Sequence, residues 1–135
     1  MPTQLEIVSP DRLLLSQPVD MAVIPAAEGD MGVLPGHAPM IVLLRGGTIT
    51  LHEGGKPTAK LFVSGGFAEV TGERCTVLAD EAIPVAEVSR AKADARLAAA
   101  EASYAAADKS DIALLDRLMD QMQSARAMSL SAEAP

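Results

Sequence analysis

The chain is poor in cysteine and in aromatic residues. Its 135 residues include one cysteine, Cys75, so the sequence excludes an intrachain disulfide and a cysteine metal cluster. This cysteine usage fits a cytoplasmic protein. Cys75 lies in a run of alternating apolar residues, and we interpret it as a buried structural thiol. Aromatic residues make up 2% of the chain and apolar residues 49%, so we expect an aliphatic core.

The chain also lacks a basic cluster and a long apolar run. The net charge is −7, and we expect no nucleic-acid binding or direct attachment to anionic lipid, because both need a basic face. The longest uncharged stretch, residues 31–44, is broken by prolines and glycines and is too short to span a bilayer. The first residues lead directly into LEIV without a basic start or apolar signal segment. We therefore expect membrane association only through a partner, without direct membrane insertion.

Residues 3–83 carry the signals of short β-strands. Runs of apolar and β-branched residues are bounded by turn residues such as Gly46-Gly47 and Gly54-Gly55, and they cover residues 4–9, 12–16, 20–24, 40–44, 48–53, 59–64, 67–70 and 74–79. Many short strands at close spacing are typical of a sandwich or barrel. We predict an antiparallel β-sandwich of about ten short strands as a domain of residues 1–84.

Beyond Pro84 the pattern changes to that of two helices. Residues 85–107 contain eleven alanines and no glycine or proline, a composition with high helix propensity. A second helix is expected after Asp108, its predicted N-cap. We predict an antiparallel helical hairpin as a domain of residues 85–135, with a frayed tail over residues 129–135.

A three-four spacing predicts one packing stripe on each helix. The stripe on the first helix is Val88, Ala91, Ala95, Ala98, Ala102 and Ala105, and the stripe on the second is Ile112, Leu115, Met119 and Met122. Methionine also suits an adaptable partner surface. We favour packing for Met119 and Met122 because they fall on the stripe, whereas Met128 is left open between packing and partner binding.

No residue pattern for catalysis is present. The chain has no Walker A sequence, GxGxxG or HExxH motif. His37 stands alone between Gly36 and Ala38 without a nucleophile, partner base or metal set, and we interpret it as a turn histidine. Asp80 and Glu81 are neighbours whose side chains would point to opposite faces of a strand, and we interpret them as a solvated strand end. The residues therefore predict no catalytic, cofactor or metal site.

Four ordered motifs carry a family resemblance. Residues 28–39, EGDMGVLPGHAP, closely resemble the EGELGILPGHAP-type segment of the epsilon subunit of bacterial F-type ATP synthases. Residues 46–49, 64–70 and 76–82 are similar to further segments of that family, in the same order. The resemblance covers residues 4–105 and implies the same architecture, a β-sandwich followed by a helical hairpin.

The resemblance implies a mechanical role in the central stalk. It implies that the flank of the sandwich binds the gamma subunit, that one end of the sandwich faces the ring of membrane c subunits, and that proton-driven rotation is thereby coupled to ATP synthesis. Glu28, Asp30 and His37 would form the ring-facing loop, shaped by a structural turn of Gly29, Gly32, Pro35, Gly36 and Pro39. The chain would be a non-catalytic, peripheral subunit at the cytoplasmic face of the inner membrane, held there by the complex.

The hairpin departs from some members of the family. In those members it contacts the alpha and beta subunits and blocks ATP hydrolysis, helped by a basic second helix. Here Arg117 and Arg126 are offset by Asp111, Asp116 and Asp120, which predicts weak inhibition.

Some members also bind ATP through a pattern like [IL]DxxRA. Here Arg90-Ala91 match the pattern, whereas Glu87 and Ala86 replace its first residues. Nucleotide or regulatory contacts would use Glu87, Arg90, Arg117 and Arg126, but the departures favour an exposed helix charge pair at i and i+3 over an ATP site.

Two other interpretations share parts of this evidence. A stand-alone β-sandwich binding module with a helical self-association tail would have the same fold, and only the motifs speak against it. A small enzyme that uses His37 would lose turnover in His37→Ala, and the absence of catalytic partners in the sequence speaks against it.

Overall fold

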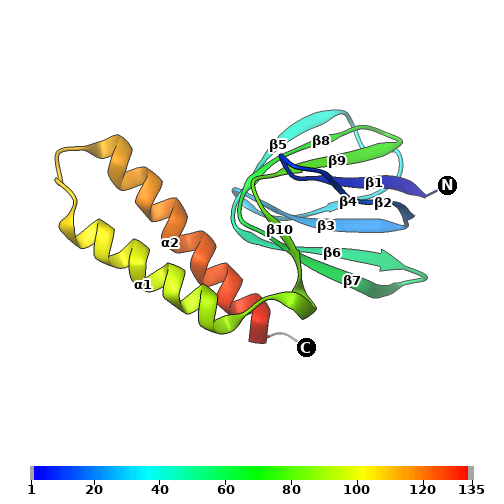
Figure 1. Cartoon of the computed structure of the whole chain (residues 1–135). Helices are drawn as coiled ribbons and strands as arrows, with labels where there is room; N and C mark the ends of the chain where they lie inside the picture. Colours follow the sequence, from blue (N-terminus) through cyan, green and yellow to red (C-terminus); the bar gives the residue numbers. More distant parts are fainter. Residues whose placement is uncertain (1, 134–135) are drawn as a thin grey trace.

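The computed structural model describes residues 2–133, which form ten strands and two long helices (Figure 1). The strands are β1 (Thr3–Val8), β2 (Leu13–Val19), β3 (Met21–Ala26), β4 (Gly29–Val33), β5 (Met40–Leu44), β6 (Gly47–Glu53), β7 (Lys56–Val63), β8 (Gly66–Val70), β9 (Arg74–Ala79) and β10 (Ala82–Pro84). A short 3-10 helix, η1 (Val85–Glu87), leads into α1 (Arg90–Ala106) and α2 (Ile112–Glu133). The predicted sandwich followed by a helical hairpin is confirmed.

The strands form two layers that are joined at one short bridge. The strand order is β10-β7-β6-β3-β5-β8-β9-β1-β2, with β4 paired beside β3. Between β3 and β5 the register consists of a single pair, Ala26 with Leu44, so the sheet folds over at this point. The strand pairs are antiparallel except for β1 with β9, which are parallel. The sequence runs did not predict β4 and β10, because β4 lies in the glycine-rich stretch and β10 has three residues.

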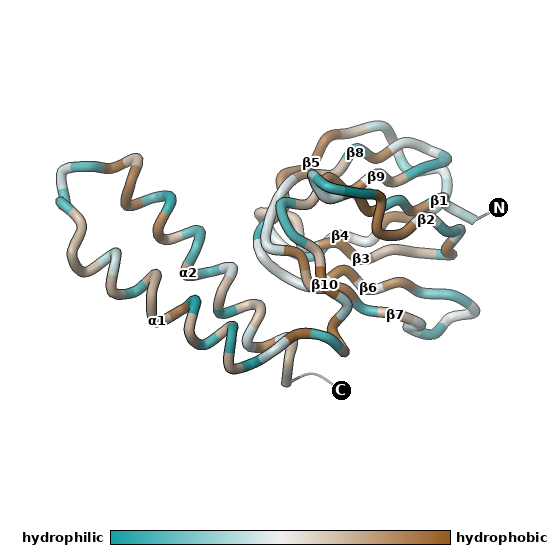
Figure 2. The backbone as a smooth tube through the Cα atoms, in the orientation of Figure 1, coloured by the Kyte–Doolittle hydropathy of each residue, from teal (hydrophilic) through white to brown (hydrophobic). Residues whose placement is uncertain are grey.

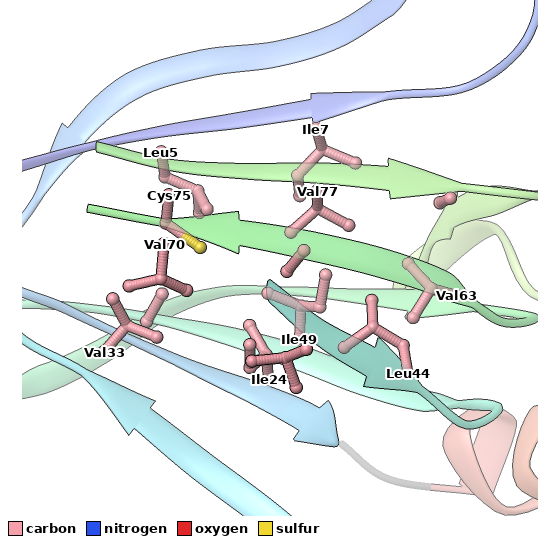
Figure 3. Packing of buried hydrophobic residues seen from close by; sticks show 14 of the residues in the cluster. Leu5, Ile7, Ile24, Val33, Leu44, Ile49, Val63, Val70, Cys75 and Val77 are labelled. Carbon is pink, nitrogen blue, oxygen red and sulfur yellow. The ribbon is translucent and has the colours of Figure 1, made fainter. Parts of the chain in front are cut away.

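The core lies between the two layers and is aliphatic, as the composition predicted. Figure 3 shows side chains of β1, β3, β5, β6, β8 and β9 meeting there, among them Leu5, Ile24 and Val77. Cys75 is fully buried in this cluster, which confirms its interpretation as a structural thiol. Burial raises the pKa of the Cys75 thiol to about 11, because the charged thiolate loses its hydration.

The two helices pack as an antiparallel hairpin whose tip points away from the sandwich (Figure 1). Along both helices hydrophilic and weakly hydrophobic segments alternate, whereas the most hydrophobic segments belong mainly to the strands (Figure 2). The buried or half-buried stripe of α1 is Ala93, Leu97, Ala100 and Tyr104, and the half-buried Ala107 follows the end of the helix. Of the stripe predicted from the sequence, Val88 is half-buried and packs against the cluster of Phe62, Ala93 and Met128. The alanine part of that stripe is wrong, since Ala91, Ala95, Ala98, Ala102 and Ala105 are exposed.

The stripe of α2 also lies partly elsewhere than predicted. Leu118, Ala125 and Met128 are its buried members, with Leu115 and Met122 half-buried beside them. Ile112 and Met119 are exposed, so their predicted packing role is wrong. Alanine is so frequent in α1 that spacing could not fix which face is buried.

Both ends of α2 differ from the sequence prediction. Asp111 caps the helix, since its Oδ1 accepts a hydrogen bond from the Leu114 amide at 3.2 Å. Asp108 instead accepts hydrogen bonds from the amide and hydroxyl of Ser110 one turn earlier. The helix continues to Glu133, so the predicted frayed tail is wrong for residues 129–133, and residues 134–135 lie outside the described chain.

Candidate functional site

His37, the histidine considered for chemistry, belongs to the loop that follows β4. In the described part of the chain, no group of three or more histidine, cysteine or acidic side chains is placed to hold a metal ion. The Nδ1 atom of His37 lies 2.8 Å from the carbonyl oxygen of the adjacent Ala38. Its amide donates to the Leu34 carbonyl, and the Gly36 amide donates to the Gly72 carbonyl. His37 is therefore a turn residue held by its own loop.

The structure separates the three residues that were expected in one ring-facing loop. Glu28 is exposed in the turn between β3 and β4, and Asp30 lies on β4 two residues later. His37 follows the other end of β4, which spans about 14 Å between Gly29 and Val33. The prediction of a single loop is wrong, because a strand separates the two acidic residues from the histidine.

Asp30 lies at the end of the sandwich that faces the hairpin. Its Oδ1 accepts from Arg45 Nη2 at 3.2 Å, while Arg45 Nε donates to the Ala26 carbonyl. Both Asp30 and Arg45 line a cavity that also contacts α2 residues. His37 lies instead beside Gly72, in the connection between β8 and β9.

The predicted structural turn is shorter than expected. Gly29 and Gly32 belong to β4, and only Pro35, Gly36 and Pro39 of the predicted turn residues lie in the loop that follows it. Gly36 has a φ of 82°, a left-handed backbone conformation that is strained in any residue with a Cβ atom. At Gly32 the backbone is ordinary, so its role is pairing with Val23 in the sheet.

An apolar row crosses the outer face of the layer that is formed by β5, β8, β9, β1 and β2. Pairing places Leu43 of β5 beside Phe67 of β8, Phe67 beside Leu78 of β9, Leu78 beside Val8 of β1, and Val8 beside Leu13 of β2. Leu43 is 69% exposed and Phe67 is 43% exposed. Five neighbouring strands thus present apolar side chains in one register, which we call the apolar row.

The two phenylalanines of the chain show how this face differs from the rest of the sandwich. Phe62, on β7, is 0% exposed because Ala93 of α1 and Met128 of α2 pack against it. Phe67 has no such cover from residues 2–133. An aromatic side chain gains most when it is fully removed from water, so the row has the character of a partner surface.

The hairpin is fixed to the sandwich by polar contacts as well. Gln123 Oε1 accepts from the Gly46 amide at 2.9 Å, and Gln123 Nε2 donates to the Gly46 carbonyl at 2.6 Å. A Cβ atom at Gly46 would lie 2.5 Å from the Ser124 Cα. Gly46 therefore permits the backbone of α2 to approach the loop between β5 and β6.

An ion pair ties α1 to the same end of the sandwich. Arg96 Nη1 and Nη2 donate to the two carboxylate oxygens of Glu81 at 2.6 and 2.9 Å. The hydrogen bonds from Arg96 hold the pKa of Glu81 below its usual value, against the opposing effect of partial burial. The interpretation as a solvated strand end fits the exposed Asp80, whereas α1 covers the Glu81 carboxylate in part.

The residues considered for nucleotide or regulatory contacts are not gathered in one place. Arg117 lines a cavity of about 600 Å³ between the hairpin and the sandwich, together with Arg96 and Ser103. Glu87 and Arg126 are exposed elsewhere, and Arg90 pairs with Asp94 at 3.9 Å. Arg90 and Ser103 are thirteen residues apart on one helix, or about 20 Å along its axis. The four side chains do not form a common phosphate site.

The apolar row was not found in the sequence, although its residues were assigned to strands. Leu43 lies in an apolar run whose inward and outward members look alike, and Phe67 and Leu78 are single outward residues. Only the register across five strands brings them together. A usable signal in the sequence was the presence of apolar residues at the alternate strand positions whose side chains are expected to face solvent.

Comparisons with known proteins agree with this architecture. Residues 2–85 match the family described as ATP synthase, Delta/Epsilon chain, beta-sandwich domain. The chain is 66% identical over 126 residues to the ATP synthase epsilon chain of Granulibacter bethesdensis, covering 93% of each chain. It is 52% identical over 135 residues to that of Gluconacetobacter diazotrophicus, covering 100% of this chain and 96% of the other.

Solved structures give the same result. A chain of the Euglena gracilis mitochondrial ATP synthase, in an assembly of OSCP, F1 and c-ring, matches 96% of this chain and 81% of its own length, with a TM-score of 0.77 and 26% identity. A chain in the central stalk and c-ring of the Tetrahymena thermophila enzyme shares the fold, with a TM-score of 0.64 and 10% identity over 98% of this chain and 97% of its own. No helix within residues 2–133 is long and apolar enough to cross a membrane. The chain belongs to the ATP synthase epsilon-chain family.

Proposed function

We propose that the chain is a non-catalytic rotor subunit, which holds the gamma subunit to the ring of c subunits so that proton-driven rotation reaches the catalytic head. The observation that carries this proposal is the apolar row on the outer face of the sandwich. Relatives in the epsilon-chain family and a neighbour from an F1 and c-ring assembly support it. The subunit is a peripheral protein. The other subunits of the complex hold it at the cytoplasmic face of the membrane.

The apolar row is the surface for gamma in this proposal. Leu43, Phe67 and Leu78 are held by paired strands, so they lose little backbone freedom when a partner covers them. A pre-organised apolar face gives a rotor joint two useful properties, namely affinity from burial and stiffness under torque.

The acidic end of the sandwich is the surface for the ring. Glu28 is exposed at one end of β4, so it can pair with basic loops of the ring, whereas Asp30 beside it is already paired with Arg45 and His37 lies at the other end of the strand. A cysteine scan separates the two ends. Glu28→Cys should cross-link to a ring subunit in the assembled enzyme and His37→Cys should not, whereas the reverse result would assign the ring contact to the histidine loop.

The hairpin is a weak regulator of ATP hydrolysis. Arg117 and Arg126 of α2 are outnumbered by Asp111, Asp116 and Asp120, so an acidic catalytic subunit attracts this helix little. Contacts with the alpha and beta subunits would need the hairpin to leave the sandwich, where Phe62, Gly46 and Glu81 hold it. Arg90 and Arg117 are far apart on the hairpin, which argues against an ATP-binding site there.

A tagged chain recovered from the native membrane fraction tests the proposal. Co-purification of gamma, the catalytic subunits and the ring, identified by mass, is the expected result. Recovery of the chain alone or as a homo-oligomer would overturn it and would favour the stand-alone binding module, with the apolar row covered by a second copy.

A further inference from the structure

A groove separates the apolar row from the docked hairpin. It has a volume of about 690 Å³. Leu43 and Phe67 of the row form one wall, and Asp120 and Gln123 of α2 form the other. The main chain of Gly65 and Gly66 forms part of the floor. A partner seated on the row would therefore reach α2 across this groove.

The charges in the groove favour a cation. Asp80 and Asp120 both line it, and neither is joined by an ion pair to a basic side chain of residues 2–133. The basic residue in the lining, Arg45, is paired with Asp30. Asp80 and Asp120 also line the adjoining cavity, where Arg96 is held by Glu81 and Arg117 supplies one positive charge against the two carboxylates. A lysine or arginine could lay its aliphatic stem along Phe67 and place its charge between the two carboxylates.

This wall exists only while the hairpin is docked. Asp120 is three residues from Gln123, whose side-chain amide binds both backbone groups of Gly46. Release of Gln123 would carry Asp120 away from Leu43 and Phe67, and the groove would lose one side.

We infer that the docked hairpin is part of the surface that binds the partner covering the apolar row, and that the partner inserts a basic side chain into the groove between Asp80 and Asp120. The inference rests on the proposed function, which identifies that partner as gamma. It adds a regulatory consequence. Since gamma then contacts both the sandwich and α2, its binding favours the docked hairpin, and docking raises the affinity for gamma by the same factor.

Binding of the full chain to purified gamma subunit tests the charge contact. Asp120→Asn and Asp80→Asn should each weaken binding about three- to tenfold at low salt, and the difference should shrink as salt is raised. Glu101→Gln is the matched control, because it removes the same charge from an exposed position on α1. Unchanged binding by both aspartate variants would overturn the inference.

A second pair of variants tests the role of docking. Gln123→Ala removes the amide contact without altering the sandwich, and Gly46→Ala drives α2 away by overlap with Ser124. Both should weaken gamma binding, and adding Asp120→Asn to Gly46→Ala should weaken it little further. Full additivity, or wild-type binding by Gln123→Ala with its hairpin shown to be released, would contradict the inference.

Phe67→Glu distinguishes this inference from the proposed function. Loss of gamma binding in Phe67→Glu together with wild-type binding in the groove variants would remove the inference and leave the rotor function standing. Wild-type binding in Phe67→Glu would mean that the row is not the gamma surface, and the proposed function would fail first.

Discussion

Gln123 of α2 and Gly46 between β5 and β6 exchange two hydrogen bonds, so that one side-chain amide satisfies both backbone groups of one residue. No positive φ requires glycine at this position. The requirement comes from the helix, since a Cβ there would lie 2.5 Å from the Ser124 Cα. The sandwich is therefore shaped to receive the hairpin.

Gly46→Ala is expected to undock the hairpin while the β-sandwich stays folded. The added methyl group must displace the α2 backbone, and overpacking of this kind costs about 1–3 kcal/mol. Hydrogen exchange should show faster exchange in residues 120–133 and unchanged protection in β6 and β9. Equal protection of α2 in the variant and the wild type would show that the loop yields instead.

Met128→Ala is expected to lower the free energy of unfolding of the docked hairpin by about 2–5 kcal/mol. Met128 is 2% exposed and packs against Phe62 and Ala93. Met119→Ala is the control on the same helix, because Met119 is 53% exposed. Chemical denaturation of both variants measures the difference, and an equal loss in the two would contradict the observed packing.

Docking of α1 is expected to weaken in acid. Arg96 lowers the pKa of Glu81 below its ordinary value of 4.5, so the folded state holds the carboxylate charged more firmly than the unfolded state does. The resulting stabilisation is present above pH 4.5 and is lost as the pH falls through the lower folded pKa. Thermal unfolding between neutral pH and pH 3 should show this loss, and Glu81→Gln should reduce it.

An acid loss of the same size in Glu81→Gln and the wild type would assign it to other carboxylates. Asp108 is a second group with a lowered pKa, through its hydrogen bonds with Ser110. It lies in the turn between the helices, so its protonation should affect exchange in that turn and not at the contact between α1 and the sandwich.

Inhibition of ATP hydrolysis by the hairpin is expected to be slight. Removal of residues 85–135 should raise the hydrolysis rate of the assembled enzyme only a little and leave the coupling of proton flow to synthesis largely intact, because the row and the acidic end remain. A large rise in hydrolysis would contradict the charge argument, and loss of coupling would contradict the division of roles between sandwich and hairpin.

Much of the architecture could be predicted from the sequence, because strand and helix periods depend on local pattern. The turn pairs Gly46-Gly47 and Gly65-Gly66 mark strand ends, and the change of period at Pro84 marks the start of the helical part. The face of α1 that packs could not be predicted, since alanine occurs on most of its faces. Leu97 and Tyr104, the larger residues, mark the face that is covered.

The candidate surfaces depend on relationships between distant residues. Glu28, Asp30 and His37 are close in sequence, but the extended strand β4 carries the histidine to the other end of the sandwich. Leu43, Phe67 and Leu78 are far apart in sequence and meet only through strand register. Strand pairing in the folded chain determines both the position of His37 and the assembly of the apolar row. A local sequence pattern does not contain this information.

The most direct test of the central claim is the affinity of the full chain for gamma in Phe67→Glu and in a control, Ala98→Glu, which places the same charge on the exposed face of α1. Burial of a carboxylate against an apolar partner is costly, so the account predicts loss of binding in Phe67→Glu, wild-type binding in Ala98→Glu, and similar unfolding curves for both. Tight binding of gamma by Phe67→Glu would contradict the claim that the apolar row joins this chain to the rotor.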